Sequence, residues 1–149
     1  MKAIAATFFI SMLPVVELRG GIPYGVAAGL DYLTAAAVAC LGNMVPVPFI
    51  ILLIRKVFNW MKQLPKVRSL IERLEARGKS KGELVKKYRL VGLILLVAIP
   101  LPGTGAWTGA LVAAMLDMQL KTAFPAILVG VLIAAAIILT ITHGVTVVF

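Results

Sequence analysis

The sequence predicts an all-α integral membrane protein, and three observations on hydropathy and charge lead to that fold class. Of the 149 residues, 61% are hydrophobic and 14% are charged, whereas about 25% are charged in an ordinary soluble domain. Residues 32–54, 90–116 and 122–149 contain no Asp, Glu, Lys or Arg. Each run exceeds the roughly 20 residues that a helix needs to cross a bilayer. The mean hydropathy of +1.02 agrees with a chain that is largely surrounded by lipid.

Residues 1–31 are predicted to form a retained helical hairpin. Lys2 precedes a short apolar stretch, as in a signal peptide, but the following VVELR offers no small-residue cleavage site. Apolar sequence lies on both sides of ELRGGIP at 17–23. Because two glycines and a proline weaken a helix, we expect the chain to break there inside the membrane.

The second uncharged run contains a similar break. Residues 90–99 and 106–116 would rise about 15 and 16 Å as helices, which is close to half of a hydrocarbon core roughly 30 Å thick. Between them PLPGTG at 100–105 cannot continue a helix, because its prolines lack backbone donors and its glycines favour open backbone. The sequence therefore predicts two half-helices that form a re-entrant hairpin.

The two breaks belong to an internal repeat with an offset of 86 residues, which places Pro14 on Pro100 and Asp31 on Asp117. Each half reads as an apolar stretch, a Pro/Gly-rich break, a small-residue apolar stretch, an Asp and a long apolar segment. The prediction is an inverted repeat of a re-entrant hairpin plus a transmembrane helix, a recurring design in transporters. If both broken segments are kinked spans instead, the chain crosses four times and its termini are cytoplasmic.

The halves, 1–54 and 90–149, are joined within one membrane domain by a basic segment at 55–89. It carries 12 of the 15 basic residues and 3 of the 6 acidic ones, while the other charges cancel. A short basic loop between membrane segments is the usual mark of a cytoplasmic loop, so we expect no nucleic acid as a partner. The pattern predicts an amphipathic helix that lies either on the inner membrane surface or on its own membrane domain; its apolar stripe is Val67, Leu70, Ile71 and Leu74.

Glu17 and Arg19 are the charged residues of the first break. Left in lipid near the bilayer centre, each would cost at least about 3 kcal/mol, so both imply a polar pocket inside the fold. Glu17 is suited to a coupling proton or a cation, and Arg19 to an anionic group such as phosphate. The alternative is that the two side chains only neutralise each other and fix the hairpin. Asp31 and Asp117 are expected to cap the helices that follow them.

Further candidates for substrate binding or coupling lie in the breaks or face the same pocket. The glycines and prolines either shape that pocket or only make turns, and Trp107 either contacts substrate or packs at an interface. A single cysteine and scattered acids supply no disulfide, metal cluster or catalytic set, so we expect neither a cofactor nor an enzyme. These candidates are Gly20, Gly21, Pro23, Asn43, Pro100, Pro102, Gly103, Thr104, Gly105 and Trp107.

The motifs ELRGGIPYGVAAG and PLPGTGAWTGALVA, with the basic segment between them, resemble the bacterial and archaeal small multidrug export family. The resemblance covers nearly the whole chain and implies a multi-pass transporter in a prokaryotic cell membrane. More distantly, the pattern is similar to the DedA superfamily, which implies paired re-entrant hairpins and movement of lipids such as undecaprenyl phosphate. Glu17 fits the acidic hairpin motif of that superfamily. Its arginine in the second motif has no counterpart here, because 90–116 is uncharged.

These features together predict a small transporter or flippase that moves a lipophilic or amphiphilic substrate, with a proton coupled through Glu17. A chain of 149 residues has few helices with which to enclose a pathway, so a homodimer in contact with membrane lipids is expected. One alternative is a flippase of lipid phosphates. An alternative of another class is a membrane scaffold that holds a partner through the basic segment.

Overall fold

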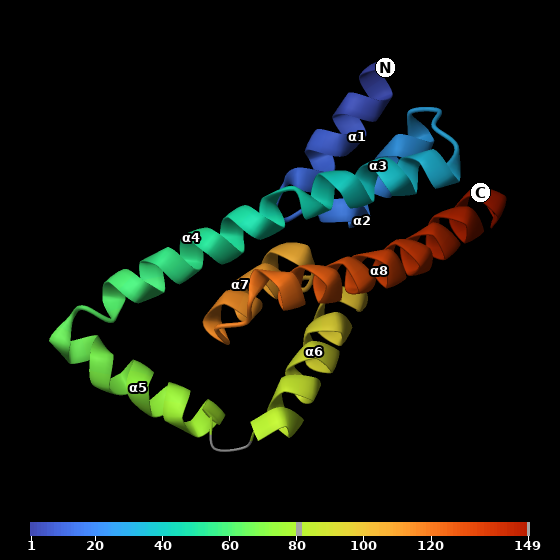
Figure 1. The fold of residues 1–149 in the computed structure, drawn as a ribbon. Helices are drawn as coiled ribbons and strands as arrows, with labels where there is room; N and C mark the ends of the chain where they lie inside the picture. The colour runs from blue at the N-terminus through green and yellow to red at the C-terminus, as the bar shows by residue number, and fades with distance from the viewer. Residues whose placement is uncertain (80–81, 149) are drawn as a thin grey trace.

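The computed structural model describes residues 1–79 and 82–148, without the side chains of residues 71, 74–79 and 82–86. Within those residues the fold is entirely helical (Figure 1). The helices are α1 (Lys2–Met12), α2 (Glu17–Ala27), α3 (Tyr32–Met44), α4 (Pro46–Met61), α5 (Pro65–Lys79), α6 (Gly82–Ala98), α7 (Ala106–Met115) and α8 (Leu120–Val148). The predicted all-α class is confirmed.

Two helical segments are long and apolar enough to cross a membrane: Tyr32–Met61, with 30 residues, and α8, with 29. The first is α3 continued by α4, with a kink at Val45. Pro46 causes the kink because it has no N–H for the carbonyl group one turn earlier.

The two long segments run antiparallel, as contacts at their opposite ends show (Figure 1). At one end the Tyr32 hydroxyl lies 2.6 Å from Thr146 Oγ1. At the other end Arg55 Nη2 lies 3.0 Å from Asp117 Oδ1 in an ion pair. We call these two ends of the bundle the Tyr32 end and the Arg55 end.

The first break lies before ELRGGIP, so the prediction that residues 17–23 form the break is wrong. Helix α1 ends at Met12, and residues 13–16 are non-helical. Leu13 is extended, with φ −70° and ψ 136°, as a residue before proline prefers, and Pro14 cannot continue the helix. Residues 17–23 are helical and form most of α2.

The glycines of α2 serve as packing surfaces and not as turn residues. A Cβ atom on Gly21 would lie 3.1 Å from Ser11 Cβ on α1 and 3.5 Å from Ala39 Cβ on α3. One turn later Gly25 meets α1 and α3 in the same way. Helices in membranes approach closely where small residues face one another, and this contact holds two glycines in a helix that they would otherwise weaken.

The second break lies where the sequence predicts it, because residues 99–105 are non-helical between α6 and α7. Helix α6 begins at Gly82 because residues 83–90 contain good helix formers and neither glycine nor proline. The ends of α1 at Met12 and α6 at Ala98 are 86 residues apart, which equals the offset of the sequence repeat.

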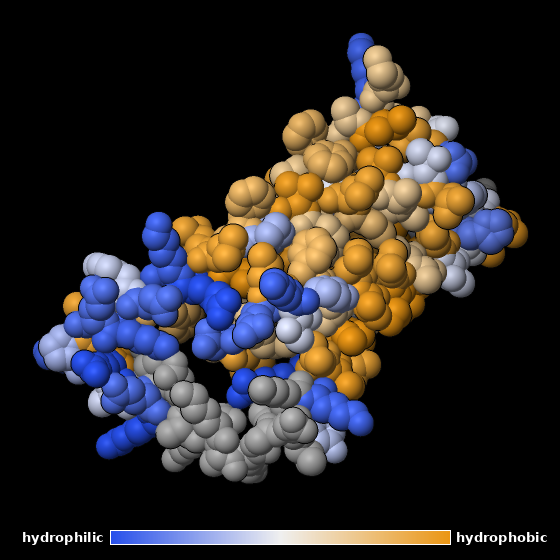
Figure 2. All heavy atoms as spheres, viewed as in Figure 1, coloured by the Kyte–Doolittle hydropathy of each residue, from blue (hydrophilic) through white to orange (hydrophobic). Residues whose placement is uncertain are grey.

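The predicted helix in the basic segment is confirmed as α5, which begins at a proline, a residue favoured in the first turn of a helix. In Figure 1, α5 lies at the Arg55 end, beyond the last turn of α4. Of its predicted apolar stripe, Leu70 is exposed, while the side chains of Ile71 and Leu74 lie outside the described residues. Figure 2 shows most of the hydrophilic side chains gathered around α5 and the Arg55 end, mainly apolar side chains over the middle of the visible face, and a few hydrophilic ones at the opposite end.

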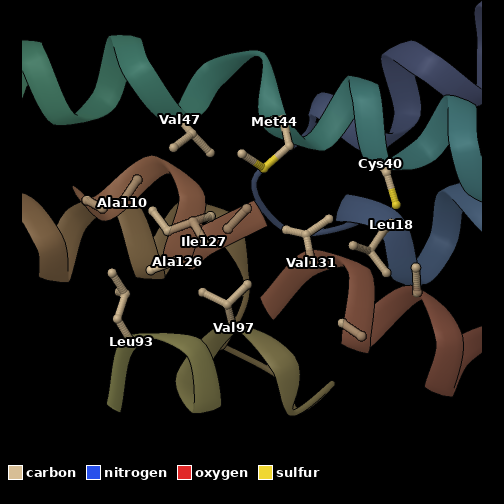
Figure 3. Packing of buried hydrophobic residues seen from close by; sticks show 14 of the residues in the cluster. Leu18, Cys40, Met44, Val47, Leu93, Val97, Ala110, Ala126, Ile127 and Val131 are labelled. Carbon is tan, nitrogen blue, oxygen red and sulfur yellow. The ribbon is translucent and has the colours of Figure 1, made fainter. Parts of the chain in front are cut away.

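The core lies where α6 and α7 pack on α8 beneath the α3–α4 segment. Figure 3 shows Leu93 and Val97 of α6 facing α8, with Val47 of α4 on the opposite side of the same core. Val97 fits against two glycines, because a Cβ atom on Gly109 or Gly130 would lie only 2.5 or 2.6 Å from its side chain. Close packing through small residues thus occurs in both halves.

Candidate functional site at the two helix breaks

Glu17 is the first residue of α2, and its side chain points into the bundle. Only 4% of the residue is exposed, and its φ of 50° lies in the left-handed region that favours glycine. Its Oε1 accepts a hydrogen bond of 3.2 Å from the backbone N–H of Trp107, in the first turn of α7. A carboxylate from the start of α2 therefore caps α7, the helix that follows the second break, where free N–H groups and the helix dipole favour negative charge.

Gly105 makes room for that carboxylate. Its φ of 137° is a conformation that other residues avoid, and a Cβ atom here would come within 2.6 Å of Glu17 Cδ. Its carbonyl accepts from the N–H of Gly109 at 2.8 Å and so begins α7. Glycine is required at this position both by backbone geometry and by space.

Arg19 bonds to the second break. Its Nη2 donates to the backbone carbonyl of Thr104 and to Thr104 Oγ1 at 3.1 Å. The same hydroxyl accepts from the N–H of Leu101 at 3.1 Å, so Thr104 holds its own loop together and receives Arg19. Within the described residues Glu17 and Arg19 form no ion pair with each other, since each bonds across to the other half.

Trp107 links α7 to both helices of the first half. Its backbone N–H donates to Glu17, and its indole Nε1 donates to the carbonyl of Met12 at 3.0 Å. Met12 is the last residue of α1, so its carbonyl accepts no hydrogen bond from within that helix. Five of the predicted residues therefore meet at one place: Glu17, Arg19, Thr104, Gly105 and Trp107.

The other predicted residues of the breaks lie around this contact or away from it. Gly20 packs on Val16, while Pro23 and Pro102 are exposed on the outside of the bundle. Gly103 has a φ of 83° with open space where a Cβ would lie, so it serves the turn. The remaining predicted positions are the half-buried Pro100, which follows α6, and the buried Gly21, which packs against α1 and α3.

Asn43 is the predicted residue of α3, and it is completely buried, with 0% exposed. Neither its Nδ2 nor its Oδ1 has a hydrogen-bond partner. Helices α2 and α3 run antiparallel, and Gly21 lies against Ala39. Glu17 lies one turn before Gly21 and Asn43 lies one turn after Ala39, so the two residues are at the same level of the bundle. The structure thus places an unsatisfied amide at the level of the buried carboxylate.

Two buried polar residues of α1 were not singled out from the sequence. Thr7 and Ser11 of α1 are both 0% exposed. Ser11 Oγ donates to the carbonyl of Thr7 at 2.8 Å, and Thr7 Oγ1 has no partner. Their four-residue spacing in an otherwise apolar helix is the signal that could have revealed a shared buried face.

The two aspartates at the helix starts behave differently. Asp31 caps α3 as predicted: its Oδ2 accepts from the N–H of Thr34 at 2.9 Å, and hydrogen bonds from Thr34 lower the pKa of Asp31. Asp117 has a φ of 53° and pairs with Arg55, so the predicted cap of α8 is wrong there. The difference arises because Arg55 of α4 reaches the turn between α7 and α8.

The site has the chemistry of a buried carboxylate, a half-buried guanidinium and a free amide. Within the described part of the chain, no three His, Cys, Asp or Glu side chains lie close enough together to hold a metal ion. What the arrangement offers is one group that can exchange a proton or a cation, and one that can bind an anion.

Two helical segments that are long and apolar enough to cross a membrane, a basic end and a polar site inside the bundle indicate a membrane protein. A family model described as "Putative small multi-drug export protein" matches residues 17–137, and the chain belongs to this family. The resemblance predicted from the motifs is confirmed, and the family description indicates a membrane transporter. No curated protein matches the chain, and no solved structure matches it.

Proposed function

We propose that the protein exports lipophilic cations in exchange for protons, with Glu17 as the group that binds each in turn. The observation that carries this proposal is the carboxylate of Glu17, 4% exposed and bonded across the two helix breaks. A carboxylate inside a membrane domain is costly and usually functional. A lipophilic cation is the substrate that such a group, in an apolar bundle, attracts most directly.

The proposed architecture is an inverted repeat in which α1–α2 and α6–α7 are re-entrant hairpins. In support, α1 and α2 have 11 residues each, and a helix of that length rises only about 16 Å. Helix α2 leads into α3 at the Tyr32 end, while α7 leads into α8 at the Arg55 end. If the basic segment is cytoplasmic, the hairpins enter from opposite sides and their breaks meet near the midplane.

The proposed exchange uses the bond between Glu17 and α7 as the switch. While ionised, Glu17 caps α7 and holds the two halves together. A cationic substrate pairs with the carboxylate, and a proton that arrives at Glu17 later removes this attraction and releases the substrate. A neutral acid is a weaker acceptor for the Trp107 N–H, so protonation also loosens the contact between the halves and favours a change of access.

We infer that the protein acts as a homodimer in the cell membrane of a prokaryote. The described bundle has only two full-length spans, which is few for enclosing a pathway through a bilayer. Many apolar side chains face outward from the helices, among them Phe9, Leu41 and Leu132. Such a surface suits contact with lipid or with a second copy of the chain.

Transport in reconstituted vesicles tests the proposal. Purified protein in proteoliposomes is given a pH gradient and a fluorescent lipophilic cation such as ethidium. Wild type should move the cation against its gradient, and Glu17→Gln should lose at least 90% of this activity while folding normally. Glu72→Gln removes an exposed acid of α5 and should leave transport unchanged. Full activity in Glu17→Gln would overturn the proposal.

A lipid-phosphate flippase is the second candidate, and the position of Arg19 favours it. Arg19 is half-buried beside the start of α7, where a helix N-terminus also attracts anions. Thermal stabilisation by a polyprenyl phosphate that is lost in Arg19→Lys would favour this function. Stabilisation by a lipophilic cation that is lost in Glu17→Gln would favour the first. A scaffold predicts that both variants work while changes in the basic segment abolish function.

A further inference from the structure

The contact between α1, α2 and α3 buries polar side chains among the smallest residues of the chain. A Cβ atom on Gly25 would lie 2.9 Å from Thr7 Oγ1 and 3.0 Å from Ala35 Cβ, so all three helices touch at this level. One turn closer to the breaks, Ser11 and Ala39 meet at Gly21 in the same way. We call this contact the polar seam; it consists of Thr7 and Ser11, Gly21 and Gly25, and Ala35 and Ala39.

Unpartnered polar atoms lie at the two ends of the polar seam. At the Tyr32 end of the seam, Thr7 Oγ1 is buried without a hydrogen bond. At the other end, one turn beyond Ala39, the amide nitrogen and oxygen of Asn43 are also buried without a hydrogen bond. Leaving a buried polar group unsatisfied costs about 1–3 kcal/mol, and single buried waters are the usual remedy. The fold therefore calls for water at each end of the seam.

The spacing of the polar groups suits a relay. Thr7 and Ser11 are one helical turn apart, and Gly21, which contacts Ser11, is one turn from Glu17. A turn rises about 5.4 Å, and one water with two hydrogen bonds of about 2.8 Å spans roughly that distance. At the level of Gly21, Ser11 Oγ occupies the space that a Cβ atom would need, so the hydroxyl itself is the relay group there.

We propose that the polar seam conducts protons from the Tyr32 end of the bundle to the Glu17 carboxylate. Ser11 Oγ donates to the Thr7 carbonyl, so Ser11 first turns its O–H toward Glu17. Each hydroxyl or water then accepts a proton from the neighbour on the Tyr32 side and passes its own proton to the neighbour on the Glu17 side. The last transfer forms the carboxylic acid of Glu17 and leaves Thr7 and Ser11 unchanged. The proton route itself does not depend on the proposed function; only the use of the proton to drive export rests on it.

The charges around Glu17 are compatible with such a route. The positive charge of Arg19 attracts the Glu17 carboxylate. The Arg19 side chain bonds to the second break and not to the seam. Helix α7, which receives the carboxylate, carries no titratable side chain. On the helices packed against α2, the other titratable side chains are Lys2 on α1, Tyr32 and Cys40 on α3, and Lys121 and His143 on α8.

Infrared spectroscopy of the reconstituted protein tests the route without measuring transport. A pH drop on the Tyr32 side should produce a carboxylic-acid band that is absent in Glu17→Gln. In Thr7→Val and in Asn43→Leu, we expect this band to form at least tenfold more slowly than in wild type. The matched control is Thr140→Val, which removes an exposed hydroxyl bonded to its own helix; its rate should equal that of wild type.

Thermal unfolding separates a relay from a structural role. Thr7→Val exchanges an unpartnered hydroxyl for a methyl group of similar size, so the melting temperature should stay the same or rise. An unchanged rate of Glu17 protonation in Thr7→Val and Asn43→Leu would overturn the route, as would the absence of any Glu17 band. If Thr7→Val and Asn43→Leu slow the formation of the carboxylic-acid band while Glu17→Gln still transports the cation, the proton route is supported and the proposed function is wrong.

Discussion

The two halves of the chain differ in the side chains that they bury. With the offset of 86 residues, Thr7 and Ser11 of α1 correspond to Leu93 and Val97 of α6, and all four are buried. The first pair lies against the glycines of α2, while Val97 lies against glycines of α7 and α8. The same close packing thus surrounds hydroxyls in one half and hydrocarbon in the other. On the proposed proton route, the first half carries the proton and the second half supports the fold.

The helix breaks differ in a complementary way. The first half supplies charged side chains of α2, Glu17 and Arg19, whereas the second half supplies the N–H of Trp107 in α7, the carbonyl of Thr104 and the open space at Gly105. Each half satisfies groups that the other leaves free. The site therefore exists only when both halves are in contact, which is why changes on either side should affect it.

The largest effect is expected from Gly105→Ala. The new methyl group would collide with the Glu17 carboxylate at a backbone conformation that alanine avoids, and strain of this kind costs about 1–3 kcal/mol before the collision is counted. Gly103→Ala is the matched control, with φ 83° and open space, and should cost only about 1–2 kcal/mol. Unfolding in a denaturing detergent measures both, and equal losses would contradict the assigned contact.

Both halves of the chain should depend equally on close helix packing at glycines. Gly42→Ala would press on the carbonyl of Phe8 in α1, and Gly130→Ala would press on Val97 in α6. Each should lower the free energy of unfolding by about 1–3 kcal/mol through overpacking. Gly144→Ala in α8 meets open space and should be neutral or slightly stabilising. Stable Gly42→Ala and Gly130→Ala proteins would show that the helices are less tightly packed.

A smaller effect is expected at the Arg55 end. The Arg55–Asp117 pair is partly exposed, and such pairs contribute about 0.2–1 kcal/mol. A double-mutant cycle with Arg55→Ala and Asp117→Asn should return a coupling energy in this range that shrinks as salt is added. A coupling well above 1 kcal/mol would mean that the pair is a main clamp between the halves.

The smallest effect concerns the cap on α3. The pKa of Asp31 is lowered in the folded protein by its bonds to Thr34, so the cap stabilises the fold above the unfolded pKa, and this gain disappears as pH falls through the folded pKa. Asp31→Asn should therefore flatten the pH dependence of stability in the acid range. Thr140→Val, whose hydroxyl is remote from the cap, should keep the wild-type profile.

Much of the fold could be predicted because composition and proline are strong signals. The uncharged runs gave the long spans, and PLPGTG gave the second break at its true position. The first break was misplaced because glycine reads as a helix breaker, while the contacts that keep Gly21 helical come from α1 and α3. Thr7 and Ser11 were overlooked because Thr and Ser hydroxyls in a helix can bond to their own backbone, so that only their four-residue spacing indicated a shared buried face.

The pairing at the site was harder to predict for the same reason. The sequence singled out Glu17, Arg19 and the second break, but two charges only two residues apart in the chain suggest an ion pair with each other. Their actual partners lie 90 and 85 residues away, at Trp107 and Thr104. Only the packing of the two halves reveals that exchange of partners.

The central claim, that two opposed hairpins bring their breaks together inside the membrane, is tested most directly by the sidedness of α8. In a Cys40→Ala background, Val147→Cys and Lys66→Cys place single thiols at exposed positions near the end of α8 and in α5. Intact cells are treated with a membrane-impermeant maleimide. The account predicts labelling of Val147→Cys from outside and of Lys66→Cys only after lysis. If both thiols react only after lysis, the chain crosses four times, and the opposed hairpins are excluded.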